Sequence, residues 1–252
     1  MIKMVDVYRS FGANHVLRGC SFDVREGETL SIIGGSGTGK SVTLKLMVGL
    51  LKPDRGEIYV DDQEISHLKD EALAEVQKKF AYVFQWGALF DSLTVGQNVA
   101  FGLHNEHKIA PEKIGDVVRE RLDLVGLSGI EHLKPAELSG GMRKRVAIAR
   151  AIAMSPKYII YDEPTTGLDP IMSDVINDLI INLQKKLGVT AIVITHDMKS
   201  AYKISNRIAM LYEGKIVGID TPPNIQNSAN PIIKQFVSGS AVGPIKMKVR
   251  AF

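Results

Sequence analysis

Apolar residues along this chain form short unbroken runs in some segments and recur at helical spacing in others. The unbroken runs predict strands buried on both faces, as in a parallel sheet. These runs lie at 80–84, 158–161 and 191–195, and the more mixed segment 28–33 also reads as a buried strand. Helices are predicted over 111–125, where apolar residues keep helical spacing, and over 171–187, which Gly188 can cap. Strands and helices in this order predict an α/β fold.

Other segments are predominantly of one structural type. Residues from about 1 to 30, and again from about 56 to 84, are β-rich with intervening turns. Residues from about 87 to 155 are mostly helical, and 207–220 predict a hairpin that turns at Glu213-Gly214.

Regular structure is expected to stop at Pro222-Pro223. This leaves a domain of residues 1–222 and a C-terminal extension of residues 223–252. A helix is predicted within the extension by the apolar spacing of Ile232, Ile233, Phe236 and Val237. Two alternatives are open: this end packs on its own domain, or the segment after Gly243 reaches a neighbouring subunit.

Residues 34–41 carry the most specific chemical pattern. They read Gly34-Gly35-Ser36-Gly37-Thr38-Gly39-Lys40-Ser41 and complete G-x-x-x-x-G-K-S/T between a predicted strand and a predicted helix. The glycines let backbone N–H groups and a helix N-terminus point at an anion. Lys40 adds a charge for the outer phosphates, and the Ser41 hydroxyl can bind Mg²⁺. The segment predicts a nucleotide-binding P-loop.

Two acidic residues follow the apolar run at 158–161. A buried parallel strand there places Asp162 at its carboxyl end, where a P-loop enzyme needs an acid beside Mg²⁺. Glu163 comes next and is placed to take a proton from an attacking water, or to orient that water. The two acids predict nucleotide hydrolysis.

Further motifs resemble the ATP-binding cassette (ABC) family. Leu138-Ser139-Gly140-Gly141-Met142 is similar to its signature L-S-G-G-Q, with Met142 in place of Gln. Gln85 matches the Q-loop, Thr166-Gly167-Leu168-Asp169 the D-loop and His196 the switch histidine. The matches occur in the family's order and cover nearly the whole chain.

The resemblance implies a fold and a set of roles. The fold is a P-loop NTPase with a RecA-like core, an antiparallel β subdomain and a helical signature subdomain at about 87–155. ATP and Mg²⁺ are the expected cofactors, and Phe11 is the residue expected to stack on adenine, with Tyr8 as the alternative. Residues expected to act in hydrolysis are Lys40, Gln85, Glu163 and His196. Residues expected to hold Mg²⁺ are Ser41, Gln85 and Asp162.

The family also implies a dimer. Its signature, here Ser139, Gly140 and Gly141, closes over the γ-phosphate bound by the P-loop of a second copy. Two copies would then enclose two ATP molecules.

The segment that follows Gln85 bears on the partner. In ABC transporters it forms the groove for an integral-membrane permease, and exposed Trp86, Leu89 and Phe90 would make an apolar docking patch. The alternative is that Leu89 and Phe90 pack inside the helical subdomain. Two classes of protein therefore stay open: a transporter ATPase, and a soluble accessory ATPase such as that of iron–sulfur cluster assembly.

The subtype resembles the Mla-type ATPases, which power phospholipid traffic between bacterial membranes with MCE-domain partners. The segments that carry this resemblance are 85–90, the signature with Met142 and the tail at 236–245. Some relatives bear a ribonucleotide-transport label, which is a second alternative. The resemblance implies a peripheral protein on the cytoplasmic face of the inner membrane.

Composition and charge are ordinary for one soluble globular unit. The net charge of +3 is too small to indicate nucleic-acid binding, and no such partner is expected. Arg143-Lys144-Arg145 are expected on the solvated face of the helix after the signature.

The single cysteine, Cys20, cannot form an internal disulfide and is expected in a strand. No apolar stretch approaches the roughly 18–20 residues that span a bilayer, and the chain opens on a strand instead of a signal peptide.

Overall fold

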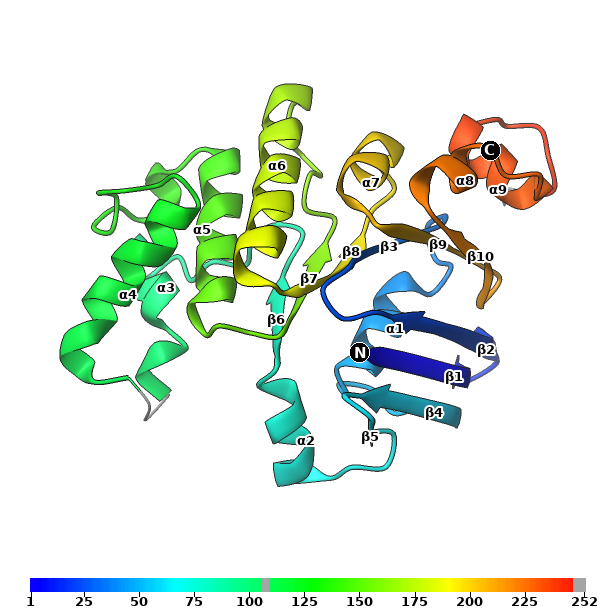
Figure 1. Ribbon diagram of the computed structural model, residues 1–252, viewed down its shortest axis with the longest axis horizontal. Helices are drawn as coiled ribbons and strands as arrows, with labels where there is room; N and C mark the ends of the chain where they lie inside the picture. Colours follow the sequence, from blue (N-terminus) through cyan, green and yellow to red (C-terminus); the bar gives the residue numbers. More distant parts are fainter. Residues whose placement is uncertain (106–108, 247–252) are drawn as a thin grey trace. The chain divides into compact units, whose positions relative to one another are not determined.

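The structure is a computed structural model of the 252-residue chain and describes residues 1–105 and 109–246 (Figure 1). Its contacts divide the chain into two compact units. Unit 1 comprises Met1–Val24, Leu30–Leu68 and the chain from Thr195 to the C-terminus, and unit 2 comprises Arg25–Thr29 and Lys69–Ile194. Both units mix helices with strands, which confirms the α/β prediction.

Unit 1 contains an antiparallel sheet in the order β2-β1-β4-β5. Its strands are β1 (Ile2–Phe11), β2 (Asn14–Val24), β4 (Arg55–Val60) and β5 (Gln63–Glu64). Along β1, Ile2, Met4 and Val7 are buried while Lys3 and Asp6 are exposed, so the strand has one apolar face. This sheet confirms the predicted antiparallel β subdomain.

A second group of strands in unit 1 includes β3 (Thr29–Ile33), which is buried along its whole length. β3 runs parallel to β9 (Arg207–Tyr212), and β9 pairs antiparallel with β10 (Lys215–Asp220). The predicted hairpin with its turn at Glu213-Gly214 is confirmed. Two helices, α1 (Lys40–Met47) and α7 (Met198–Ile204), complete this part of the unit.

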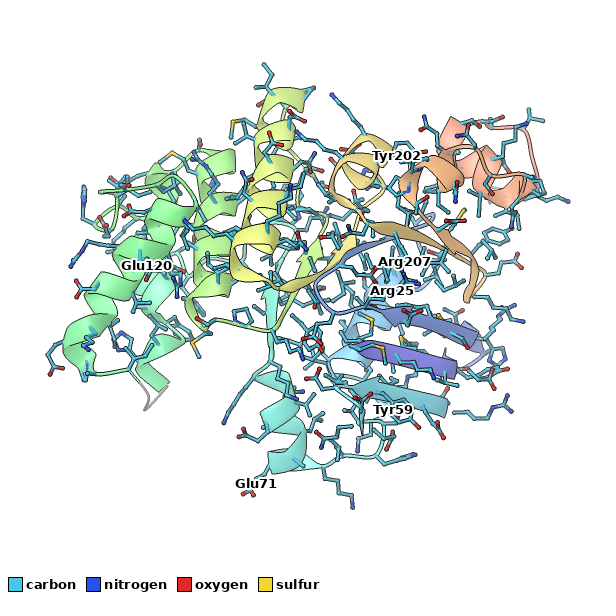
Figure 2. All side chains as sticks on the ribbon, viewed as in Figure 1. Arg25, Tyr59, Glu71, Glu120, Tyr202 and Arg207 are labelled. Carbon is cyan, nitrogen blue, oxygen red and sulfur yellow. The ribbon has the colours of Figure 1, made fainter. Side chains whose placement is uncertain are left out.

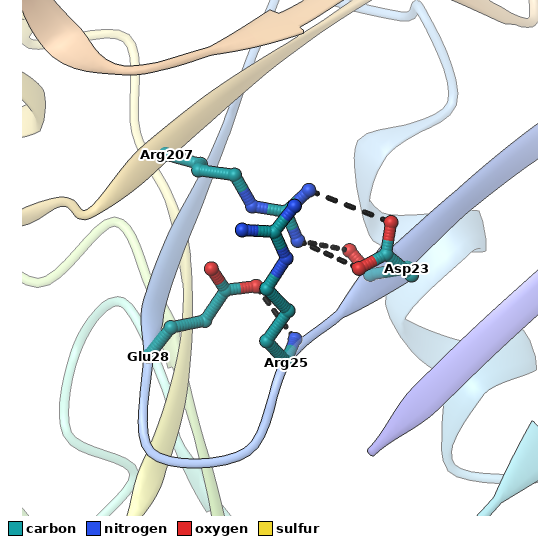
Figure 3. Close-up of polar contacts among 4 residues, drawn as sticks. All are labelled: Asp23, Arg25, Glu28 and Arg207. Carbon is teal, nitrogen blue, oxygen red and sulfur yellow. Dashed lines mark hydrogen bonds and ion pairs between the residues drawn. The ribbon is translucent and has the colours of Figure 1, made fainter.

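An ion pair ties β9 to the end of β2 within unit 1. The Arg207 guanidinium donates to the Asp23 carboxylate at 2.8 Å and to the Asp23 carbonyl oxygen at 3.0 Å (Figure 3). In unit 2, the backbone N–H of Arg25 donates to the Glu28 carboxylate at 2.6 Å. The first contact joins two strands, and the second stabilises the turn at 25–28.

The expectation that regular structure stops at Pro222-Pro223 is wrong. A helix, α8 (Pro222–Gln226), begins at this pair, and α9 (Pro231–Ser238) follows. Thr221 is the N-cap of α8, so the prolines occupy the first helical positions, where no intrahelical N–H bond is lost. The helix predicted from the apolar stripe of the tail is confirmed as α9, and its C-cap, Gly239, has a left-handed backbone with φ of 65°.

The described part of the tail packs on its own unit. Ile233 is buried in a core cluster with residues of β3 and β9, and Tyr202 of α7 packs against the same cluster (Figure 2). The buried Gln235 accepts a hydrogen bond from the Ile245 N–H at 2.6 Å and donates to the Ser240 and Ile245 carbonyl oxygens. Residues 247–252, on which the neighbouring-subunit alternative also depends, lie outside the described residues.

Unit 2 contains the parallel strands β8-β7-β6. The strands are β6 (Phe80–Val83), β7 (Tyr158–Asp162) and β8 (Thr190–Ile194). The helices are α2 (Asp70–Gln77), α3 (Val95–Ala100), α4 (Pro111–Leu124), α5 (Gly140–Ala153) and α6 (Pro170–Leu187), with 3₁₀ turns at Leu103–Asn105 and Pro135–Glu137. Gly188 caps α6 with φ of 65°, as predicted.

Helix α2 corrects the expectation that residues from about 56 to 84 are β-rich with intervening turns. Its sequence Ala72-Leu73-Ala74-Glu75 consists of strong helix formers, which outweigh the strand patterns on either side.

None of the helices within the described residues is long and apolar enough to cross a membrane.

The burial of Cys20 gives a prediction about the fold. Cys20 lies in β2 with no exposed surface, and burial raises the pKa of its thiol to about 12. Because the thiolate is the reactive species, we expect native protein at pH 8 to resist a thiol reagent such as DTNB. Protein unfolded in guanidinium should react at its single cysteine and serves as the control. Fast, complete labelling of the native protein would contradict the placement of β2.

Candidate functional site

The P-loop joins β3 to α1 in unit 1, as the sequence predicts. Gly34 has φ of 151°, and a Cβ atom there would lie 2.3 Å from the Leu211 carbonyl oxygen. Gly39 has φ of 105°, and its Cβ would lie 2.9 Å from the Val16 side chain. A side chain at either position would displace the loop, so both glycines are required by geometry.

Lys40 points back across the loop that precedes it. Its ammonium donates to the carbonyl oxygens of Gly34 at 2.8 Å and Gly35 at 2.9 Å, and the Thr38 hydroxyl also donates to Gly35. A positive charge therefore lies inside the loop at the N-terminus of α1, where the helix dipole also favours anions. This donor set fits a polyphosphate.

A cavity of about 250 Å³ adjoins the loop in unit 1. It is lined by Phe11, Val16, Gly37 and residues 39–42, which include Ser41. Phe11 is 46% exposed and offers a ring surface at the cavity. The ring of Tyr8, the alternative, instead carries the Arg55 guanidinium at 4.2 Å. The arrangement favours Phe11 as the residue that stacks on a base.

His196 is exposed and lies two residues before the start of α7 in unit 1. The next residue, Asp197, caps α7 by accepting the Lys199 N–H at 3.0 Å and receives support from Thr195, whose hydroxyl accepts the Asp197 N–H. The cap fixes the backbone on which His196 stands.

Asp162 ends β7 in unit 2 and is partly buried. The Tyr82 hydroxyl donates to its carboxylate at 2.8 Å, and burial together with this bond raises the pKa of Tyr82. An oriented carboxylate of this kind suits Mg²⁺, because outer partners fix the direction of metal ligands. Gln85 lies two residues beyond the end of β6 and is half-buried.

Glu163 adopts a left-handed backbone conformation, with φ of 51°. Its N–H donates to the Ile194 carbonyl oxygen at 2.8 Å, and its carboxylate accepts the Thr166 hydroxyl at 3.1 Å. Residues with a Cβ pay roughly 1–3 kcal/mol for such backbone strain, which is common at functional sites. The half-buried carboxylate is held in one orientation, as a general base requires.

The expected solvent exposure of Arg143-Lys144-Arg145 is wrong for Lys144. Lys144 is only 6% exposed, and its ammonium donates to the Glu163 carbonyl oxygen at 3.3 Å. Arg145 is half-buried and donates to the Val125 and Gly126 carbonyl oxygens. Sequence reasoning missed Lys144 because a cation between two arginines carries no local signal of burial.

The signature residues begin α5. Ser139 is the N-cap and accepts the Met142 N–H at 3.2 Å, while Gly140 and Gly141 form the first turn. Ser139 and Gly140 are exposed, so this helix N-terminus is open to an anion. A Cβ at Gly141 would lie 2.4 Å from the end of the Met172 side chain, so a larger residue would crowd α6.

A groove of about 500 Å³ in unit 2 is lined by both apolar and charged residues. The apolar ones include Trp86, Leu89 and Leu168, and the charged ones are Asp91, Arg143 and Lys144. Trp86 is 71% exposed, and Phe90 is 41% exposed with its ring against Phe101. Arg150 of α5 supports the segment by donating to the Gly87 and Ala88 carbonyl oxygens, each at 2.8 Å. Leu89 is partly buried, but Trp86 and Phe90 offer apolar surface to a partner.

The expected site residues are divided between the two units. Phe11, the P-loop and His196 belong to unit 1, whereas Gln85, the signature, Asp162 and Glu163 belong to unit 2. Each set has the geometry described above within its own unit. That both sets act on one ATP stays a prediction.

Curated relatives match this chain over most of its length. It is 43% identical to the Arabidopsis thaliana protein TRIGALACTOSYLDIACYLGLYCEROL 3, chloroplastic, covering 98% of this chain and 76% of that protein. It is 37% identical to the Mycobacterium leprae probable ribonucleotide transport ATP-binding protein mkl, covering 98% and 71%. It is 37% identical to the Escherichia coli K12 intermembrane phospholipid transport system ATP-binding protein MlaF, covering 100% and 93%.

A solved structure and a family description agree with these relatives. The dimeric ATP-binding cassette MJ0796, in a post-hydrolysis state bound to ADP and Pi, matches with a TM-score of 0.79 and 33% identity, covering 88% of this chain and 99% of that one. The family described as "ABC transporter" matches residues 17–166, more than half of the chain. The chain therefore belongs to the ABC transporter family, and it is an ATPase cassette of that family.

Proposed function

We propose that this chain is the ATP-hydrolysing subunit of a transporter that moves phospholipid between bacterial membranes. ATP hydrolysis is supported by the ordered geometry of the expected site residues in each unit. In unit 1 the P-loop carbonyl oxygens hold the Lys40 ammonium, and in unit 2 a backbone hydrogen bond fixes Glu163 just after β7. The cargo is supported by the similarity to MlaF along the whole chain.

Each residue has a proposed role in one ATP site. The P-loop amides, Lys40 and Phe11 bind the nucleotide, and Ser41, Gln85 and Asp162 hold Mg²⁺, which neutralises phosphate charge when bound. Glu163 takes the proton of the attacking water, and His196 contacts the γ-phosphate. The open cavity at Ser41 and the Tyr82 bond to Asp162 support these roles.

We propose that hydrolysis takes place in a dimer, where Ser139, Gly140 and Gly141 bind the γ-phosphate held by a second copy. The exposed N-terminus of α5 supports this role, as does the dimeric state of the related cassette MJ0796. ATP would bind both copies at once and so stabilise the closed pair.

The proposed partners are an integral-membrane permease and an MCE-domain protein, with this chain peripheral on the cytoplasmic face of the inner membrane. Trp86 and Phe90 are exposed, and Arg150 holds the backbone between them by a hydrogen bond to Gly87. Exposed apolar side chains on a fixed segment are typical of a protein-binding surface, which favours a permease partner over the soluble accessory alternative. A ribonucleotide cargo stays the alternative, since the mkl relative carries that label.

Substitution of Glu163 tests the motor. We expect Glu163→Gln to retain ATP binding and to lose turnover by about 100-fold or more, because the amide cannot accept a proton. ATP turnover, nucleotide affinity and dimer content by light scattering should be measured on the full-length protein. The mutant should accumulate an ATP-bound dimer, whereas turnover close to the wild type would remove Glu163 from the role of general base.

Substitution of Trp86 tests the partner. We expect Trp86→Glu to fold and bind ATP but to lose co-purification with membrane protein, because a charge would be buried in the docking patch. The matched control is Leu187→Glu, which adds the same charge at a side chain 37% exposed at the end of α6. Wild-type protein that carries no membrane partner when its genomic neighbours are co-expressed would favour the accessory class.

The complex of the wild-type protein with its co-purified membrane partner can be used to identify the cargo. Mass spectrometry of the extracted complex should find bound phospholipid, and vesicles that contain the complex should transfer labelled phospholipid only with hydrolysable ATP. Bound ribonucleotide without phospholipid would instead support the mkl label.

A further inference from the structure

Lys144 is a buried cation that the roles above do not use. Only 6% of the residue is exposed, and its ammonium lies 3.3 Å from the Glu163 carbonyl oxygen. Burial of a charge is costly unless a polar partner compensates for it. Burial lowers the pKa of Lys144 to about 8, and the nearby Glu163 carboxylate opposes that change, so the side chain is mainly an ammonium donor at pH 7.

The backbone that receives this bond is a strained one. Glu163 has a Cβ atom and yet adopts φ of 51°, so surrounding contacts must hold it there. The Thr166 N–H donates to the same carbonyl oxygen at 3.2 Å, and the Glu163 N–H donates to Ile194 at 2.8 Å. Lys144 adds a charged donor to this set, and hydrogen bonds from charged donors are stronger than neutral ones.

Lys144 also lies close to the signature along the chain. It belongs to α5, whose N-cap is Ser139, and it stands about one turn beyond the signature glycines. A Cβ at Gly140 would lie 3.7 Å from the Leu168 side chain of the D-loop, so the start of α5 also packs on the segment that follows Glu163. A displacement of the signature would therefore be transmitted to Glu163 through the first turns of α5 and the Lys144 hydrogen bond.

We infer that Lys144 is a positioning residue that couples the signature to the general base of its own chain. A γ-phosphate that engages Ser139, Gly140 and Gly141 would fix the N-terminus of α5, and Lys144 would then hold the Glu163 backbone in its productive conformation. Each copy would thus sense ATP bound by its partner and adjust its own base. The inference rests on the proposed function, in which Glu163 is that base and the signature acts on a second copy.

Lys144→Met is the first test, because it retains the buried aliphatic stem and removes the donor. In single-turnover assays of the full-length protein, we expect the rate constant for ATP cleavage to fall on the order of tenfold, since small misplacements of a reacting group cost this much or more. The ATP concentration for half-maximal cleavage should change by less than about twofold, because Lys144 lies outside the proposed nucleotide contacts. Lys144→Arg, which restores a charged donor, should recover most of the rate.

The matched control is Lys185→Met, which removes an exposed lysine of α6 and should behave as the wild type. The thermal midpoint of each variant is measured alongside its rate. If Lys144→Met does not fold, Lys144→Gln replaces it, because the amide is one bond shorter and should not reach the carbonyl oxygen, giving the same loss of rate.

A double mutant distinguishes positioning from a general loss of structure. If Lys144 acts through Glu163, Lys144→Met should have little further effect on cleavage in a Glu163→Gln background. An equal loss in both backgrounds, or a rate for Lys144→Met within twofold of the wild type, would overturn the inference while Glu163→Gln keeps only its low residual turnover. Retained turnover in Glu163→Gln alone would instead overturn the proposed base, and the inference with it.

Discussion

The complete burial of two short strands determines where the reactive groups of this protein lie. Every residue of β3 is buried, and so are the four residues of β7 that precede Asp162. Each fully buried large apolar side chain contributes roughly 1.5–3 kcal/mol, so neither strand can slide without a large loss of stability. Because the strands are fixed, their carboxyl ends are fixed, and these ends place the P-loop in one unit and Asp162-Glu163 in the other.

Helix N-termini supply the second common feature of the two units. In unit 1, α1 begins at Lys40 and presents its N-terminus to the P-loop. In unit 2, α5 begins after Ser139 and presents exposed amide groups with small residues in front of them. Both ends suit phosphate for the same reason: the N–H groups of a first helical turn and a helix dipole face the ligand, and glycine keeps side chains out of the way. One chain thus presents two helix N-termini that suit anions, and the proposed function assigns them to different nucleotides.

The sequence predicts those parts that depend on local patterns. The P-loop, β7, α4, the hairpin of β9 and β10 and the capped end of α6 all follow from apolar spacing or from turn residues. The errors have physical causes. Pro222-Pro223 indicates a break only until Thr221 is considered as a cap, which makes the same pair a helix start. Lys144 could not be placed, because its burial depends on a backbone carbonyl 19 residues away that adopts an unusual conformation.

In the proposed mechanism, the P-loop of one copy and the signature of another bind the same ATP. A mixed dimer of Lys40→Ala and Ser139→Arg chains tests this claim most directly, because it combines one doubly defective site with one site free of both substitutions. We expect each homodimer to fail to cleave ATP, and we expect mixing the two to restore cleavage at the intact composite site. A mixture as inactive as the two homodimers would exclude a composite site, and so would loss of ATP binding by monomeric Ser139→Arg.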